Sequence, residues 1–166
     1  MKNILVIGSG SIARKHINNL LSLKYNIYVY SRENVNFFKR NKNIFRIVNL
    51  NNLPKIYFAI VANKTNEHLK TLEFLVNNKI NIYCEKPIYF KKFNFKKIGE
   101  KIKKNKLIFF MGYQLLNDSK VLYVKKKLSN VKVRSFQASV GHNFEKWRVS
   151  GVRKKSYFSR TSLGGG

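Results

Sequence analysis

The first dozen residues constrain this 166-residue chain more than any other segment. Residues 3–7 read Asn-Ile-Leu-Val-Ile, a short apolar run rich in β-branched side chains. Such a run predicts a strand buried on both faces, as in a parallel sheet covered by helices. Glycines follow at once, and apolar residues then recur with the spacing of one helix face, at Ile12, Ala13, Ile17, Leu20 and Leu21. The chain therefore begins with a buried strand, a glycine turn and a helix.

The same alternation of strands and helices continues along the chain. Further strands are predicted at residues 27–30, 44–48, 56–61, 80–84 and 107–111. Between them the sequence predicts a short helix at 35–40, a helix capped by Thr65 or Asn66, and a lysine-rich helix built on Phe95, Ile98 and Ile102. Strands that alternate with helices predict the α/β class, here a Rossmann-type doubly wound parallel sheet with helices on both faces.

The alternation of short strands and helices ends after residue 114. Residues 115–128 are predicted to form one longer helix, and the alternation over 131–140 favours a strand. Residues 142–163 are polar and aromatic without a clear period, and the chain ends in Gly164-Gly165-Gly166.

The glycine turn has the pattern G-x-G-x-x-A, formed by Gly8, Ser9, Gly10, Ser11, Ile12 and Ala13. In such a turn the first glycine permits the tight bend and the second lets the backbone approach a pyrophosphate. The helix N-terminus then offers free N–H groups to the anion. Because the pattern directly follows a strand and opens a helix, it predicts dinucleotide binding. The alternative is a glycine turn in an α/β protein that binds no nucleotide.

The end of the second strand bears on which dinucleotide is bound. A site that prefers NAD usually has an acidic residue about 20 residues after the glycines, which binds the ribose 2′-hydroxyl. Here Ser31 and Arg32 follow the strand, and an arginine beside a hydroxyl suits a 2′-phosphate. We therefore expect NADP(H) to be favoured over NAD(H). Glu33 keeps NAD(H) open, and an ordinary surface arginine is the alternative for Arg32.

Polar residues also follow the fourth and fifth strands. The fourth runs into Asn63-Lys64-Thr65-Asn66-Glu67-His68, and the fifth into Cys84-Glu85-Lys86-Pro87. In an open α/β sheet the ligand lies outside the carboxyl ends of the strands, so these segments are candidates for the site. A structural place in the first helical turn is the alternative for His68, and Cys84 is expected to be a buried small hydrophobe.

Taken together, these segments resemble the Gfo/Idh/MocA oxidoreductases. The resemblance rests on the glycine pattern, the segment ending in His68, and the Glu85-Lys86-Pro87 tripeptide. It continues through Met111-Gly112-Tyr113-Gln114 and Trp147-Arg148 to the Ser162–Gly166 end. It implies a Rossmann domain, here residues 1–114, followed by an α/β substrate domain with a mostly antiparallel sheet. Residues 115–166 would be the incomplete start of that second domain.

The resemblance also implies roles for individual residues. Lys86 would be catalytic and touch the substrate, Gln114 would lie near the substrate, and the reaction would move a hydride between nicotinamide and a sugar- or cyclitol-type carbon. The implied cofactor contacts are Gly8, Ser9, Gly10, Ser11, Ile12, Ser31, Arg32, Asn63, Thr65, His68, Glu85, Lys86, Trp147 and Arg148. The family's Asp and His that complete the active site are not matched, so a truncated, inactive chain is expected. A full-length form is expected to be a homo-oligomer.

Charge and cysteine content bear on other function classes. The chain has 34 Lys and Arg against 7 Asp and Glu, a formal net charge of +27. A basic polyanion-binding protein is therefore one alternative, and a non-catalytic nucleotide-binding regulator is another. Residues of A/T-rich codons dominate the composition, however, so we expect no specific nucleic-acid partner.

The single cysteine excludes an internal disulfide and a usual structural zinc site, and no metal is expected. A cytoplasmic protein without a membrane segment is expected.

Overall fold

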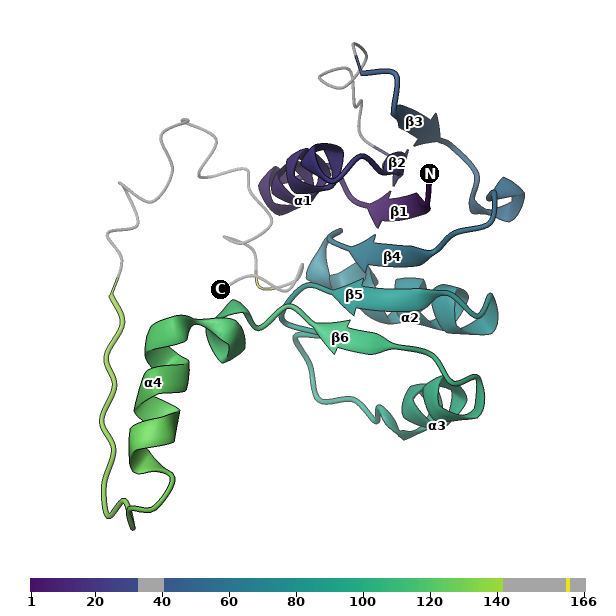
Figure 1. Ribbon diagram of the computed structural model, residues 1–166. Helices are drawn as coiled ribbons and strands as arrows, with labels where there is room; N and C mark the ends of the chain where they lie inside the picture. Colours follow the sequence, from purple (N-terminus) through teal and green to yellow (C-terminus); the bar gives the residue numbers. More distant parts are fainter. Residues whose placement is uncertain (33–40, 142–160, 162–166) are drawn as a thin grey trace.

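The computed structural model describes residues 1–32, 41–141 and 161. Its centre is a six-stranded sheet in the order β3-β2-β1-β4-β5-β6, in which every neighbouring pair is parallel (Figure 1). The strands are β1 (Asn3–Ile7), β2 (Asn26–Tyr30), β3 (Ile44–Ile47), β4 (Phe58–Val61), β5 (Asn81–Cys84) and β6 (Phe109–Met111). This order places the reversal of winding between β1 and β4 and confirms the doubly wound Rossmann-type sheet.

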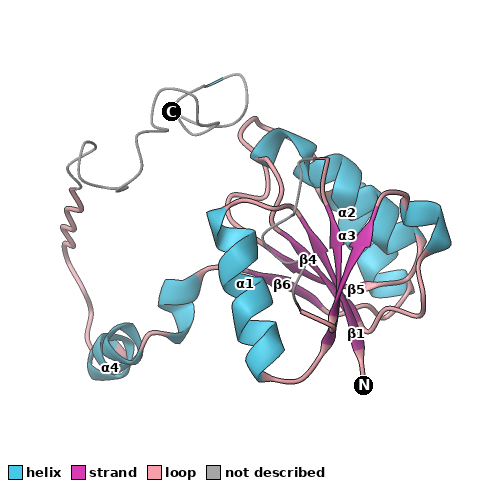
Figure 2. Ribbon diagram, turned by 90° about the horizontal axis from the view of Figure 1, so that it is seen from above, coloured by secondary structure: helices cyan, strands magenta, loops and turns pink. Residues whose placement is uncertain are grey.

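Helices cover both faces of the sheet. The α-helices are α1 (Ser11–Ser22), α2 (His68–Asn77), α3 (Lys96–Lys104) and α4 (Ser119–Leu128). Short 3-10 helices occur at η2 (Leu50–Asn52), η3 (Thr65–Glu67) and η4 (Gln114–Asn117). Figure 2 shows α1 on one side of the sheet and α2 and α3 on the other.

Two hydrophobic cores result from the alternation of side chains along β1. Ile4 and Val6 pack with Ala13, Ile17 and Leu20 of α1. Leu5 and Ile7 belong to the opposite core, with Leu72, Leu75 and Val76 of α2 and Ile98 of α3. All four strand residues are at most 2% exposed. A strand with no polar face is thus explained by helices on both sides, as its sequence predicted.

Three α-helices end in the same way. A lysine follows each helix with positive φ, 58° at Lys24, 54° at Lys79 and 53° at Lys106. The next N–H in each case donates to a carbonyl five residues earlier, as Ile80 N does to Leu75 O at 3.0 Å. This is the Schellman arrangement, in which glycine is the usual residue with positive φ. The chain then enters β2, β5 or β6 directly.

The segment after β6 differs from the sequence prediction. The expected helix over 115–128 is split into η4 and α4, because the Asp118 side chain accepts hydrogen bonds from the N–H groups of Lys120 and Val121 and starts a new helix. The expected strand over 131–140 was wrong, since residues 132–141 have no regular structure. No described strand lies beside them to complete a ladder.

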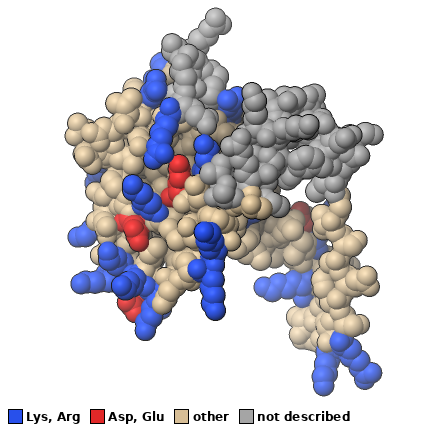
Figure 3. Space-filling model, turned by 180° about the vertical axis from the view of Figure 1, so that it is seen from behind, with Lys and Arg blue, Asp and Glu red and all other residues tan. Residues whose placement is uncertain are grey.

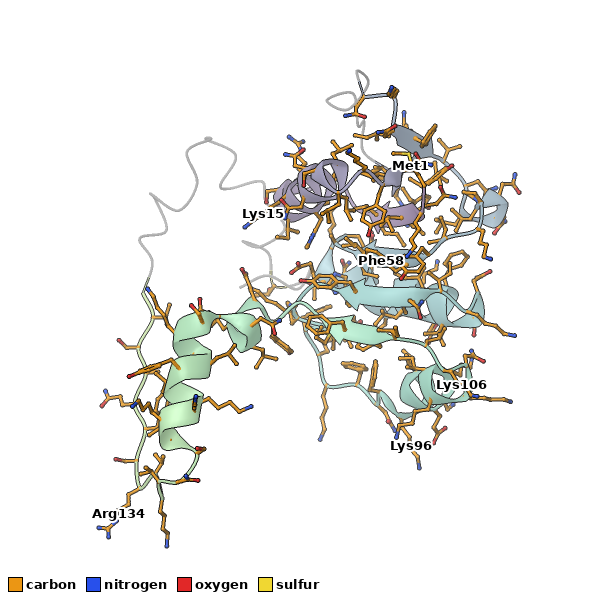
Figure 4. All side chains as sticks on the ribbon, viewed as in Figure 1. Met1, Lys15, Phe58, Lys96, Lys106 and Arg134 are labelled. Carbon is orange, nitrogen blue, oxygen red and sulfur yellow. The ribbon has the colours of Figure 1, made fainter. Side chains whose placement is uncertain are left out.

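This segment is also separate from the cores. α4 has no buried residue, and Figure 1 shows it extending away from the sheet. Figure 4 shows Arg134 at the end of the segment farthest from the sheet. The expected division into residues 1–114 and 115–166 remains a prediction.

The start of α2 also differs from the sequence prediction. Thr65 and Asn66 do not cap α2, because the chain first makes the 3-10 turn η3 and Glu67 occupies the cap position without a side-chain hydrogen bond. The short helix expected at 35–40 lies outside the described residues. Within the described ranges, no helix combines the length and apolar character that crossing a bilayer requires.

Candidate functional site

The glycine loop between β1 and α1 contains two glycines with different surroundings. Gly8 has φ +123°, and a Cβ there would lie 2.4 Å from the carbonyl oxygen of Ala62. Only glycine fits this approach of the β1 end to the β4 end. Gly10 is exposed, and a Cβ there would meet no atom of the described residues within 4 Å. The backbone at Gly10 is therefore open to a ligand, directly before the helix.

The loop is held by side chains around Ser9. Ser9 is buried, and its hydroxyl accepts a hydrogen bond from the Ser31 hydroxyl at 2.8 Å. Arg14 Nε donates to the Ser9 carbonyl at 3.1 Å. Gly10 is the N-cap residue of α1, and Ser11 and Ile12 lie in the first turn of the helix. The end of β2, the loop and the start of α1 are thus fixed to one another at the N-terminus of this helix.

Arg32 lies on the surface just after β2. Its side chain is 77% exposed, and Nη1 is 3.3 Å from Oε1 of Glu67 in η3. This contact connects the end of β2 to the segment after β4. Glu33, the alternative partner for a ribose hydroxyl, lies outside the described residues.

Asn63 and Thr65 follow β4 as the sequence suggested. Asn63 Nδ2 donates to Thr71 Oγ1 at 3.0 Å and to Glu67 Oε2 at 3.3 Å. The Asn63 Oδ1 atom is buried and has no hydrogen-bond partner within the described part of the chain. A buried acceptor without a donor is costly, so this atom offers a place for a ligand hydroxyl or amide. Thr65 is only 2% exposed.

His68 lies beneath the two loops that follow β4 and β5. Its Nδ1 is 3.0 Å from the Pro87 carbonyl oxygen and its Nε2 is 3.1 Å from that of Asn63. Burial lowers the pKa of His68, although the two carbonyls partly oppose this effect. A neutral ring can donate from only one nitrogen at a time. His68 contacts both loops and is therefore suited to holding them in place.

Cys84, at the end of β5, is fully buried. Burial raises the pKa of its thiol to about 12, so it stays protonated at neutral pH. It is a core residue, as expected from the sequence.

Glu85 follows β5 and pairs with a residue that the sequence analysis did not select. Its Oε1 is 2.7 Å from Nε2 of His16 in α1. The ring of Tyr83 meets the His16 ring edge-on at a centroid distance of 5.3 Å. One signal could have revealed His16: it lies three residues after Ala13 and four before Leu20, on the sheet-facing side of α1, where a polar ring needs a partner.

Lys86 follows Glu85, is exposed, and precedes Pro87 in a cis peptide bond. Gln114 is also exposed and begins η4 just after β6. Trp147 and Arg148 lie outside the described residues. Within those residues no group of three His, Cys, Asp or Glu side chains is arranged to hold a metal ion.

These segments all lie at the carboxyl edge of the sheet, around the β1–β4 reversal. Among the described residues, this edge offers a glycine with open space at its Cβ position, a helix N-terminus, an exposed arginine, an amide oxygen without a hydrogen-bond partner and an exposed lysine. The helix N-terminus and the cationic side chains suit an anionic ligand such as a diphosphate.

Comparison with known proteins agrees with the fold. Residues 2–113 match the model of a family described as the oxidoreductase family with an NAD-binding Rossmann fold, the Gfo/Idh/MocA family. No protein of curated function matches the sequence significantly.

Solved structures share the fold at low sequence identity. One is a probable dehydrogenase from Thermotoga maritima, with 22% identity, a TM-score of 0.68 and coverage of 77% of this chain and 41% of that one. Another is myo-inositol 2-dehydrogenase from Lactobacillus plantarum, with 19% identity, a TM-score of 0.68 and coverage of 78% and 41%. A third, from Desulfitobacterium hafniense, is called an NADPH-dependent oxidoreductase, with 21% identity, a TM-score of 0.67 and coverage of 76% and 39%. The matched region is thus about two fifths of each of these proteins.

Proposed function

Because the chain belongs to the Gfo/Idh/MocA oxidoreductase family, with its NAD-binding Rossmann fold, we propose that it binds a nicotinamide dinucleotide across the carboxyl edge of the sheet. The observation that carries this proposal is the contrast within the glycine loop. Gly8 is required by the fold itself, whereas nothing in the described structure requires a glycine at Gly10. An open backbone at a helix N-terminus, kept free of a Cβ, is what a diphosphate needs.

We propose that each half of the sheet contacts one half of the ligand. The diphosphate would lie over Gly10 and the first turn of α1, and the adenosine ribose would lie at the end of β2, near Ser31 and Arg32. The nicotinamide half would then lie over the ends of β4 and β5, near Asn63 and Lys86. The bound nicotinamide would supply or accept the hydride.

Lys86 is the residue we propose to act on the substrate. Its exposed ammonium follows the rigidly held Glu85 and can donate a hydrogen bond to a substrate oxygen. In its neutral amine form the same side chain can accept the proton that a hydroxyl loses as the carbon is oxidised, and as the ammonium it can return that proton on reduction. Gln114, which opens η4 beyond β6, would contact the same substrate.

The substrate we propose is a sugar or cyclitol. A structure sharing the fold is a myo-inositol 2-dehydrogenase, which supports this class at low identity. The complete activity, and a homo-oligomeric state in the cytoplasm, are proposals for a protein of the full length seen in these structures.

We further propose a preference for NADP(H). Arg32 has five N–H donors, so its contact with Glu67 leaves others for a 2′-phosphate. A hydrogen bond to a charged group contributes ~1.5–3 kcal/mol, or roughly tenfold to a hundredfold in affinity. A fold relative is called NADPH-dependent, which is in line with this assignment.

The test is a titration of the chain with NADPH and NADH, followed by the fluorescence of the reduced nicotinamide. NADPH should bind more tightly, and Arg32→Ala should remove most of the difference by weakening NADPH alone. Arg134→Ala, on the segment away from the sheet, is the matched control and should change neither affinity. Absence of binding to either nucleotide would reject the cofactor site. Equal affinities would reject the preference and leave Glu33 as the candidate ribose partner.

A further inference from the structure

We propose that His16 is a positioning residue that, through Glu85, joins the phosphate-binding helix to the Lys86 segment, so that the two halves of the dinucleotide are bound by one rigid frame. The inference rests on the proposed cofactor site and adds a residue to it. Its basis is a single contact that crosses the β1–β4 reversal, between α1 of the first half and the end of β5 in the second.

The contact is short and shielded. His16 Nε2 and Glu85 Oε1 are 2.7 Å apart, and the two side chains are only 19% and 11% exposed. Hydrogen bonds to a charged group are stronger when water is partly excluded. The Glu85 backbone is fixed as well, because its N–H donates to the Val61 carbonyl at 2.9 Å. Glu85 is therefore held both by its main chain and by its side chain.

The surroundings leave the carboxylate little freedom. A Cβ at Gly112 would lie 2.9 Å from the Tyr83 hydroxyl and 3.2 Å from Glu85 Oε1, so the backbone just after β6 lies close against this group. The Tyr83 ring packs edge-on against His16 on the same side. Burial, with the Glu85 carboxylate as a second cause, raises the pKa of Tyr83, so its hydroxyl remains protonated beside the pair.

The consequence concerns Lys86. It follows Glu85 directly, so the direction in which the chain presents the lysine depends on where Glu85 is held. His16 lies on the helix whose first turn would bind the diphosphate. A fixed His16–Glu85 bond therefore sets the distance between the diphosphate end and the nicotinamide end of the site.

This arrangement predicts a selective loss. Without the bond, α1 and the glycine loop keep their own contacts and the Glu85 N–H still donates to Val61, but the segment after β5 loses its side-chain link to α1. His16→Leu should therefore weaken NADPH binding by roughly tenfold, within the tenfold to hundredfold that one hydrogen bond to a charged group can contribute at most. The same variant should bind 2′-phospho-ADP-ribose, which lacks the nicotinamide, as tightly as the unchanged chain does. A residue that merely stabilised α1 would affect both ligands equally.

The experiment measures both ligands by calorimetry on the 166-residue chain, with folding checked by circular dichroism. His16→Gln keeps an N–H donor toward Glu85 and should restore most of the NADPH affinity. Asn18→Leu, an exposed position on the same helix, is the matched control and should leave both affinities unchanged. If His16→Leu does not fold, His16→Asn replaces it, because its shorter amide cannot reach Glu85.

The outcomes separate this inference from the proposed function. Equal losses for both ligands, or unchanged NADPH binding by a folded His16→Leu chain, would overturn the inference and leave the cofactor site intact. Failure of the unchanged chain to bind either ligand would reject the proposed function and the inference with it.

Discussion

Gly8 and Gly10 are two residues apart, yet the fold makes opposite demands on them. Gly8→Ala places a Cβ 2.4 Å from a backbone oxygen at φ +123°, so we expect the free energy of unfolding to fall by more than about 2 kcal/mol. The Cβ of Gly10→Val would meet no atom of the described residues within 4 Å, so the fold should persist while the branched side chain occupies the proposed diphosphate position. Thermal unfolding and NADPH titration of both variants measure the two effects.

The pair of glycine variants serves as its own control. A folded Gly10→Val chain that binds NADPH normally would show that the diphosphate lies elsewhere. A Gly8→Ala chain as stable as the original would show that the β1 and β4 ends can separate at little cost.

His68 makes stability depend on pH in a defined direction. Burial lowers its pKa below the usual value of about 6.5. Below that pH the unfolded chain binds a proton at this residue and the folded chain resists it, so the free energy of unfolding falls as the pH falls from 7 toward 5. The contribution is fully present above pH 6.5. We expect His68→Gln to lose less stability over this interval than the unchanged chain does.

Urea denaturation at several pH values checks this expectation. Both chains retain the His16–Glu85 pair and all carboxylates, so the difference between their pH profiles isolates His68. Parallel profiles would mean that the folded protein takes up the proton at His68 without cost.

At the scale of elements, the three Schellman turns offer a stability test. A non-glycine residue with positive φ destabilises the folded chain by about 1–2 kcal/mol, and a glycine avoids this cost. The greater freedom of glycine in the unfolded chain offsets part of that gain. Lys79→Gly, at the end of α2, should therefore raise the free energy of unfolding by about 0.5–1 kcal/mol. Glu73→Gly, exposed within the same helix, should lower it by about 1 kcal/mol. Urea denaturation that showed both variants destabilised would indicate that the Lys79 side chain contributes contacts of its own.

The sheet was predictable from the sequence because its signals are local. Residues 4–7 have no polar face, and each later strand is a mostly apolar run that a helix or loop ends, so type and order could be deduced. The region after residue 114 was not, because an alternating sequence forms a strand only beside a partner. Residues 132–141 have no such partner among the described residues. Asp118 likewise ended one predicted helix because its side chain caps the next.

In the candidate site, too, residues with a local sequence signal could be predicted, and residues that depend on distant partners could not. Gly8 and Gly10 could be identified from the sequence because the short glycine motif by itself predicts the turn that they form. His16 and Glu85 are 69 positions apart, and only the parallel order of β1, β4 and β5 brings them together. His68 was singled out for a place near the ligand, but the orientation of its ring toward two carbonyls depends on loops that sequence periodicity does not describe.

At the scale of the whole molecule, the positive charge has a partial explanation within the fold. Lysines occupy the last turns of α3 and α4, at Lys101, Lys103 and Lys104 and at Lys125, Lys126 and Lys127. Cations at helix C-termini interact favourably with the helix dipole. Figure 3 shows blue Lys and Arg side chains spread over the visible face rather than lining one groove. Diffuse charge of this kind attracts any polyanion without recognising it.

This distribution predicts two salt dependences in one molecule. Binding to double-stranded DNA should be independent of sequence and should fall steeply between about 50 and 200 mM salt, by a factor on the order of 10³ if about six phosphates are contacted. NADPH presents few charges to a site built from backbone N–H groups and one arginine, so its affinity should change far less over the same range. Parallel titrations of the same preparation, one with labelled DNA and one with NADPH, compare the two slopes. DNA binding that persisted at 200 mM salt with a preference for one sequence would instead identify a specific nucleic-acid site, and would make the net charge of +27 a functional property rather than a consequence of composition.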